Sequence, residues 1–311
     1  MRICSLLPSA TEILYALGLG DEIVAVSHEC DYPADARRKL QAIRTVIDQD
    51  HASSETIDQQ VRQALRDHES LYQVDTALLA RLAPDVVVTQ ELCEVCAIDT
   101  ATVSVALRAL PHPPQVVTLH PHTLEQVFEE IRLLGQVTGR DEEAQRLITS
   151  ARARIERVQA RLRDVTHRPR VFCLEWLKPP MASGHWVPEQ VALAGGVEVL
   201  GRPAEPSRYV SEEEIVASQP DILVLMPCGF PIERTRRELA ILTAQPWWSR
   251  LPAVQRGQVF IVNGPAYFNR SGPRLIDGIE LLAGVFHPDR CRDLIPPPAS
   301  VEPVPDSCRL F

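Results

Sequence analysis

The chain has 311 residues, of which 45% are hydrophobic, 23% charged and 5% aromatic. This apolar content is typical of a globular protein and excludes collagen-like and disordered chains. The formal charge of −9, from 41 acidic and 32 basic residues, argues against nucleic-acid binding. No apolar run approaches the roughly 18 residues of a membrane span, so membrane insertion is not expected. The eight cysteines are neither dense nor regularly paired, which argues against a disulfide scaffold.

The amino terminus shows no pattern of a secretory signal. Its apolar run ends at Pro8, whereas the apolar core of a signal peptide spans roughly 7–15 residues and precedes a cleavage site. The sequence as written therefore predicts a cytoplasmic protein. A periplasmic location is expected only if the start site is misassigned.

Short apolar runs alternate with helical patterns along both halves of the chain, which is typical of parallel α/β structure. The predicted strands cover residues 2–7, 22–27, 85–89, 115–119, 170–174, 221–226 and 258–262. A helix is predicted over residues 10–17, where Gly18 ends it. Each half therefore carries its own set of strand and helix units.

The longest helical pattern lies between the two halves. Apolar residues recur at spacings of three and four from Asp141, a candidate N-cap, to a point before Pro169. The predicted organisation is an N-terminal lobe over residues 1–120, a connecting helical segment over 121–168 and a C-terminal lobe over 169–288. Residues 289–311 are rich in proline and predicted to form a loose tail.

Several segments, in order along both halves, resemble one known family. They are residues 5–12 (SLLPSATE), 82–88 (LAPDVVV), 210–211 with 219–225 (QPDILVL), 253–259 (AVQRGQV) and 271–275 (SGPRL). The chain resembles the helical-backbone, or class III, substrate-binding proteins of iron-siderophore and cobalamin ABC importers, and within them the cobalamin-binding-protein-like subgroup. The resemblance implies two Rossmann-like lobes with central parallel sheets, one long connecting helix and a ligand held in a cleft between the lobes.

The resemblance also implies a surface glutamate on each lobe that docks on the transporter. Glu213 matches this position in the second lobe, whereas the position in the first lobe falls near Ala77. This departure, together with the missing signal, makes docking on an ABC permease doubtful.

Unusual polar and aromatic residues follow the predicted strands at their carboxyl ends, where parallel α/β sheets bind ligands. Carboxylates, imidazoles and aromatic rings there suit a large planar ligand. The candidate ligand-binding residues are His28, Glu29, Tyr32, Glu91, Glu175, Trp176, His185, Trp186, Tyr267 and Arg270. Each of these has a competing interpretation as an ordinary packing residue of the lobe.

Cys93 and Cys96 form a CxxC pair, a spacing that can supply two ligands of a zinc site. No second such pair exists, so the remaining ligands of a site for Zn or Fe would have to come from the isolated residues Cys30, Cys173, His28 or His185. Two alternatives stay open: the thiols are small buried apolar residues, or Cys93 and Cys96 form a redox pair.

No nucleophile elbow, zinc-protease, P-loop or dinucleotide motif is present, so an enzyme is not expected. The leading interpretation is a monomer that binds a corrinoid or related metal chelate and requires no cofactor. One alternative is a thiolate protein holding Zn or Fe on the same fold. The other is a conventional substrate-binding component of an ABC importer with a missed signal peptide.

Overall fold

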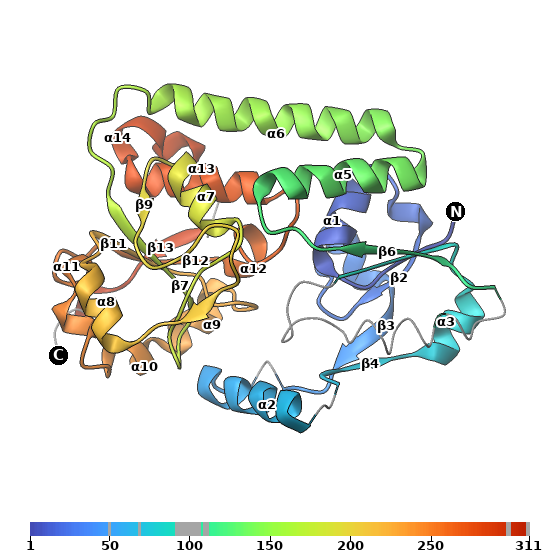
Figure 1. The fold of residues 1–311 in the computed structure, drawn as a ribbon, viewed down its shortest axis with the longest axis horizontal. Coiled ribbons are helices and arrows are strands. Elements are labelled where there is room, and N and C mark those ends of the chain that lie inside the picture. The colour runs from blue at the N-terminus through green and yellow to red at the C-terminus, as the bar shows by residue number, and fades with distance from the viewer. Residues whose placement is uncertain (49–50, 68–69, 91–106, 108–111, 297–299, 309–311) are drawn as a thin grey trace. The chain divides into compact units, whose positions relative to one another are not determined.

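The strands of the chain pair into two separate sheets, one in each of two units. The computed structural model describes residues 1–48, 51–67, 70–90, 107, 112–296 and 300–308 (Figure 1). The first unit comprises Met1–Pro121, Glu125–Thr149 and Ser271–Pro273, and the second His122–Leu124, Ser150–Arg270 and Arg274–Phe311. Residues 121–168, expected as a connecting segment, are thus divided between the two units.

In the part of the first unit that the structure describes, the strand order is β4-β3-β2-β1-β5-β6, with only β4 antiparallel to its neighbour. The strands are β1 (Ile3–Ser5), β2 (Ile23–Ser27), β3 (Leu40–Thr45), β4 (Tyr72–Val74), β5 (Val86–Gln90) and β6 (Gln115–Leu119), and the helices are α1 (Pro8–Ala16), α2 (Ser54–Asp67), α3 (Thr76–Leu82) and α5 (Leu124–Thr138). Helix α1 packs on β1 and β2. Pro8 starts this helix with a preset φ, and Gly18, at φ +77°, turns the chain away after it.

In the described part of the second unit, the order is β10-β8-β7-β11-β12-β13, and β9 pairs with β7. The strands are β7 (Arg170–Trp176), β8 (Met181–Ala182), β9 (Val197–Glu198), β10 (Arg208–Tyr209), β11 (Ile222–Leu225), β12 (Val259–Val262) and β13 (Val301–Pro303), and the helices are α7 (Val187–Leu193), α8 (Glu212–Ser218), α9 (Ile232–Arg237), α10 (Leu239–Thr243), α11 (Pro252–Gln255), α12 (Gly264–Tyr267), α13 (Leu275–Phe286) and α14 (Pro288–Cys291). Strand β11 is buried along its whole length, as expected for a central parallel strand covered on both faces. Trp247 and Trp248 lie in the core of this unit.

The predicted α/β class with two sheets is confirmed. Helix α6 runs from Asp141 to Arg161 and thus ends before Pro169, as predicted. Val165 and Thr166 follow it, and these β-branched residues have low helix propensity.

The predicted loose tail is wrong for residues 300–308. Strand β13 pairs antiparallel with β12, Val304 is buried, and the indole Nε1–H of Trp248 donates to the carbonyl of Cys308 at 2.8 Å. The reason is that the edge of β12 carries unpaired N–H and C=O groups, which β13 satisfies. Among the described residues, no helix has the length and apolar character that a membrane crossing requires.

Candidate functional site

The carboxyl ends of β1, β2, β3, β5 and β6 share one edge of the first sheet, because these strands run parallel. His28, Glu29 and Cys30 follow β2 at this edge. The His28 N–H donates to the carbonyl of Ile43 at 3.1 Å, and the Glu29 N–H donates to the Ser27 hydroxyl at 3.3 Å. The backbone of the two candidate residues is therefore fixed on the sheet.

The His28 ring has both nitrogens buried, and neither has a hydrogen-bond partner among the described residues. Its Nε2 lies 3.8 Å from Oε1 of Glu29, and its ring centroid lies 6.2 Å from that of Tyr72. Buried polar groups usually have hydrogen-bond partners, so an unsatisfied imidazole suggests a place for a ligand atom. Tyr32, four residues further on, is 48% exposed. Glu91 lies outside the described residues.

Cys30 lies in a cluster of hydroxyl groups in the first unit. The Thr11 hydroxyl donates to its Sγ at 3.1 Å, and the Ser27 Oγ lies 3.4 Å away. Cys173, in the second unit, is fully buried in β7, and burial followed by the charge of Glu198 raises its pKa well above the usual value. Cys93 and Cys96 lie outside the described residues, and the described part of the chain holds no group of three or more His, Cys, Asp or Glu placed for a metal.

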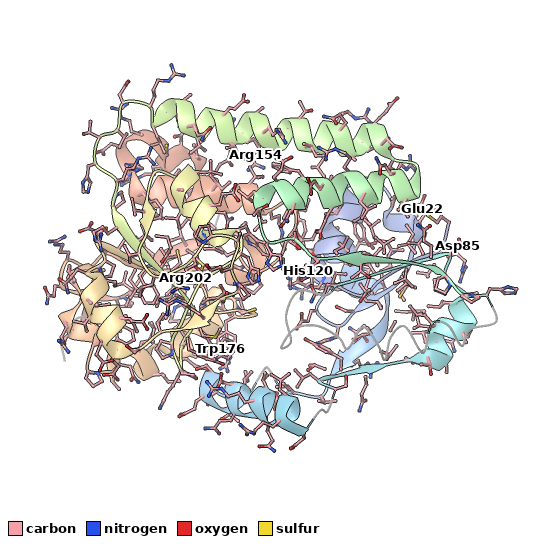
Figure 2. The ribbon with its side chains drawn as sticks, in the orientation of Figure 1. Glu22, Asp85, His120, Arg154, Trp176 and Arg202 are labelled. Carbon is pink, nitrogen blue, oxygen red and sulfur yellow. The ribbon has the colours of Figure 1, made fainter. Side chains whose placement is uncertain are left out.

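At the end of β7 in the second unit, Glu175 and Trp176 are half-buried. Trp176 is labelled in Figure 2. The Ser207 hydroxyl donates to Oε2 of Glu175 at 2.9 Å. The Trp176 ring lies 5.2 Å from that of Phe230, and the Arg234 guanidinium lies 4.7 Å above the Phe230 ring. Polar and aromatic side chains, namely Glu175, Ser207, Trp176, Phe230 and Arg234, thus lie at this strand end.

His185 adopts the left-handed region, with φ +52°. Its N–H donates to the carbonyl of Glu205 at 2.6 Å, and its carbonyl accepts from the N–H of Ala204 at 2.9 Å. Its ring stacks on that of His122 at 5.3 Å between centroids. A strained backbone held by two hydrogen bonds is typical of a functional loop.

Trp186 differs from the expectation of a ligand contact. It is 5% exposed, and its Nε1–H donates to the carbonyl of Phe268 at 2.7 Å. Trp186 therefore packs inside the second unit and fixes the segment that follows α12. Tyr267 and Arg270, in and after that helix, are half-buried.

Glu213 is exposed in the first turn of α8. Its own backbone N–H and the Ser211 hydroxyl lower its pKa, so it presents a carboxylate to solvent. Ala77, in the first turn of α3, is also exposed.

Two residues that the sequence did not single out, His122 and Arg234, lie beside the candidate residue His185 and beside Phe230. His122 follows β6, so the strand-end rule applied to the other candidates could have found it. Arg234 carried no such signal, because it lies inside α9, where its pairing with Glu238 at 2.6 Å reads as an ordinary helical i,i+4 pair.

The sequence of the chain is similar to the sequences of known binding proteins. The sequence profile described as periplasmic binding protein matches residues 3–266. A vitamin B12-binding protein of Vibrio cholerae is 28% identical over 285 residues, covering 90% of this chain and 86% of the relative. An uncharacterized ABC transporter substrate-binding lipoprotein of Bacillus subtilis is 24% identical over 298 residues, covering 94% of this chain and 82% of the relative.

Solved structures share the fold. The periplasmic vitamin B12 binding protein of Vibrio cholerae superposes with a TM-score of 0.64 at 24% identity, covering 92% of this chain and 96% of that one. The periplasmic heme-binding protein RhuT from Roseiflexus sp. RS-1 superposes with a TM-score of 0.69 at 20% identity, covering 95% and 99%. At these identities the structures support the fold and not a ligand.

Together the matches confirm the expected family resemblance and a binding protein rather than an enzyme. They do not support two other expectations. A cytoplasmic location finds no support in a family described as periplasmic or in a lipoprotein relative. The expectation that docking on an ABC permease is doubtful is not supported either, because the Bacillus subtilis relative is described as an ABC transporter substrate-binding lipoprotein.

Proposed function

The chain belongs to the periplasmic binding protein family, and on that premise we propose that it binds a corrinoid such as cobalamin, or a closely related metal chelate. The observation that carries this proposal is the similarity to a vitamin B12-binding protein along nine-tenths of the chain. The binding needs no resident cofactor.

Six residues at the strand ends are proposed to bind the ligand. In the first unit they are His28, Glu29 and Tyr32, and in the second unit Glu175, Trp176 and His185. A corrinoid is a broad ring edged with amide groups. The aromatic side chains suit the ring faces, and the carboxylates suit the amide N–H groups. The imidazole of His28, which follows β2, supports this proposal because its ring nitrogens can donate to or accept from amide groups.

Titration of the purified chain tests the proposal. Cyanocobalamin, dicyanocobinamide, hemin and a ferric siderophore are each titrated by calorimetry and by absorbance. The expected result is saturable binding of a corrinoid at micromolar concentration or below. If the chain bound only hemin or only the siderophore, the proposed corrinoid would be wrong and the ligand class would be the one that bound. If none of the four compounds bound, the proposal would be overturned.

A pair of variants tests the assigned residues. Glu175→Gln removes the carboxylate charge beside Ser207 and is expected to weaken corrinoid binding about tenfold, a loss of about 1.4 kcal/mol. Glu212→Gln makes the same change on an exposed residue of α8 and is expected to leave binding unchanged. Equal affinities for the two variants would remove Glu175 from the site.

Delivery to an ABC permease is the proposed use of the bound ligand. The exposed Glu213 carboxylate is proposed as a docking contact in the second unit. With a cobalamin ABC permease reconstituted in nanodiscs, Glu213→Ala is expected to weaken complex formation while ligand affinity stays unchanged. Complex formation equal to that of the unmodified chain would exclude this role.

A further inference from the structure

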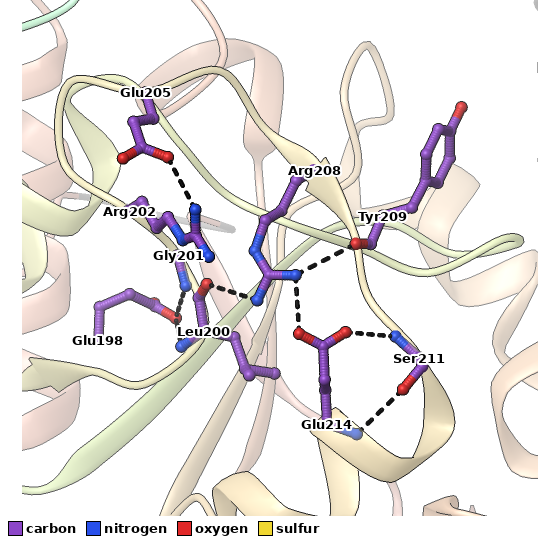
Figure 3. A network of polar contacts seen from close by, with 9 residues as sticks. All are labelled: Glu198, Leu200, Gly201, Arg202, Glu205, Arg208, Tyr209, Ser211 and Glu214. Atoms are coloured by element: carbon purple, nitrogen blue, oxygen red, sulfur yellow. Dashed lines mark hydrogen bonds and ion pairs between the residues drawn. The ribbon is translucent and has the colours of Figure 1, made fainter.

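Residues 199–211 of the second unit form a segment that we call the brace, and Glu198 holds its first turn (Figure 3). One oxygen, Oε1, accepts the N–H groups of three successive residues: Val199 at 3.1 Å, Leu200 at 3.1 Å and Gly201 at 3.0 Å. The other oxygen, Oε2, accepts the N–H of Cys173 in β7 at 3.1 Å. Glu198 therefore fastens the brace to the central sheet.

Only a carboxylate satisfies the N–H groups of Leu200, Gly201 and Cys173 at once, whereas the Val199 N–H also donates to the carbonyl of Val171 at 2.9 Å. Both oxygens of a carboxylate are acceptors, whereas a glutamine would turn an NH₂ group toward one of the donors. Burial raises the pKa of Glu198, and the N–H groups of Gly201, Leu200 and Cys173 oppose that rise. The three N–H groups converging on Oε1 make an anion-binding turn that the chain's own carboxylate fills.

Arg208 joins the two ends of the brace. Its Nη1 donates to Oε1 of Glu214 at 2.8 Å, and its Nη2 reaches the carbonyl of Leu200 at 3.5 Å (Figure 3). The other oxygen of Glu214 accepts the N–H of Ser211 at 2.9 Å, and the Ser211 hydroxyl accepts the N–H of Glu214 at 3.2 Å. This capping box fixes the start of α8, so Arg208 ties the first turn of the brace to a rigid helix end.

The middle of the brace contacts two of the proposed ligand-binding residues. Ala204 and Glu205 pair with the backbone of His185, and Ser207 donates to the carboxylate of Glu175. Gly184 leaves no space between the two loops, because a Cβ there would collide with the carbonyl of Glu205. A shift of the brace would therefore move His185 and Glu175.

We propose that Glu198 and Arg208 are positioning residues for ligand binding: through the brace they hold the Glu175 carboxylate and the His185 ring in the geometry that the ligand requires. This inference rests on the proposed function. Neither residue contacts the ligand; each acts through residues 199–207. Loss of either anchor is expected to weaken binding even where the unit stays folded.

The test compares Glu198→Gln and Arg208→Lys with Arg237→Gln as the control. Arg237 is an exposed arginine of α9 and lies outside the brace. Both anchor variants are expected to lose about tenfold in corrinoid affinity, a difference of about 1.4 kcal/mol, and the control to stay within about twofold. The side-chain resonances of His185 in the ligand-free protein are expected to shift in both anchor variants and not in the control.

The resonance measurement separates positioning from mere stabilisation. A stabilising role alone would lower the thermal midpoint and leave the His185 signal and the affinity of the folded protein unchanged, which would overturn the proposal. If Glu198→Gln does not fold, Arg208→Lys carries the same test, because Lys keeps the charge but not the two-pronged contact. If the unmodified chain binds none of the four ligands, the proposed function fails, while the His185 resonances still decide whether the brace positions that ring.

Discussion

The N–H of His120 donates a 2.6 Å hydrogen bond to Oε1 of Glu130, a carboxyl group on a residue that is only 7% exposed. The other oxygen, Oε2, has no hydrogen-bond partner among the described residues. Burial raises the pKa of Glu130 to about 8, although the His120 N–H lowers it. The folded chain therefore keeps a proton on Glu130 over a pH range in which the unfolded chain has lost it.

Because the folded chain binds this proton more tightly, its free energy of unfolding is predicted to fall as the pH rises. The loss caused by ionising Glu130 is absent below about pH 4.5, where Glu130 is protonated in both states, and complete above about pH 8. The expected loss from Glu130 is on the order of 3–5 kcal/mol. Glu130→Gln is expected to remove this dependence in urea unfolding at about pH 5 and pH 9. Glu129→Gln changes an exposed neighbour on α5 and is the control. If the unfolding free energies of the two variants changed equally between the two pH values, the prediction would be contradicted.

Glu280 on α13 is predicted to be a main stabilising contact of α6. It is 7% exposed and accepts from Arg154 at 3.1 Å and from Arg157 at 2.7 Å. Burial raises its pKa, but the two guanidinium groups outweigh burial and lower it. Its stabilising effect is therefore lost as the pH falls through that lowered pKa. Glu280→Gln is expected to cost about 2–3 kcal/mol in denaturant unfolding at neutral pH. Glu142→Gln, an exposed site on α6, should leave the unfolding midpoint unchanged; an equal loss there would refute the assignment.

Trp186 and Trp176 are predicted to respond in opposite ways to substitution by phenylalanine. Trp186→Phe removes the hydrogen bond to the Phe268 carbonyl and is expected to cost about 1–3 kcal/mol of stability while ligand affinity stays unchanged. Trp176→Phe is expected to reduce affinity and leave stability nearly unchanged. Calorimetric titration and thermal unfolding of both variants decide the matter, and a weaker affinity in Trp186→Phe would return Trp186 to the site.

The carboxyl-terminal strand is predicted to be needed for stability. Val304 is 3% exposed and directly follows β13. Val304→Asp therefore buries a carboxylate that has no compensating positive charge, and it is expected to lower the free energy of unfolding by more than about 3 kcal/mol. Pro305→Ser, on the exposed neighbour, is expected to have little effect. Thermal unfolding followed by tryptophan fluorescence measures both, and a Val304→Asp chain as stable as the unmodified one would contradict the strand's role.

The central strands could be predicted because each contains a short run of apolar residues. Strand β11 is apolar and buried along its whole length, and β5 begins with three buried valines before Thr89 and Gln90. Strands β8, β9 and β10 have two residues each, and no periodicity can be recognised in so short a segment. Strand β13 follows a proline-rich stretch, and only its pairing with β12 makes it a strand.

The candidate site was predicted in part. Its location at the strand ends followed from the parallel topology, which places all carboxyl ends at one edge of each sheet. The role of each side chain did not follow, because Trp176 and Trp186 both lie near strand ends in the sequence. Only the packing in the folded chain distinguishes them: the Trp176 ring is half-buried beside Phe230, whereas the Trp186 ring is buried and hydrogen-bonded to the Phe268 carbonyl.

The charge of −9 and the eight cysteines could be counted in the sequence, but the surroundings of Cys30 and Cys173 became known only from the folded structure. The sequence by itself determined the α/β class and the two sheets, because these depend on the alternation of apolar and helical patterns along the chain, and it indicated the family through segments that resemble known members. The tertiary structure alone decided that Cys30 lies beside the hydroxyl groups of Thr11 and Ser27, that Cys173 lies beside Glu198, and that the brace is hydrogen-bonded to Glu175 and His185. These relationships join residues distant along the chain, and hydrogen bonds and burial between such residues exist only after the chain has folded.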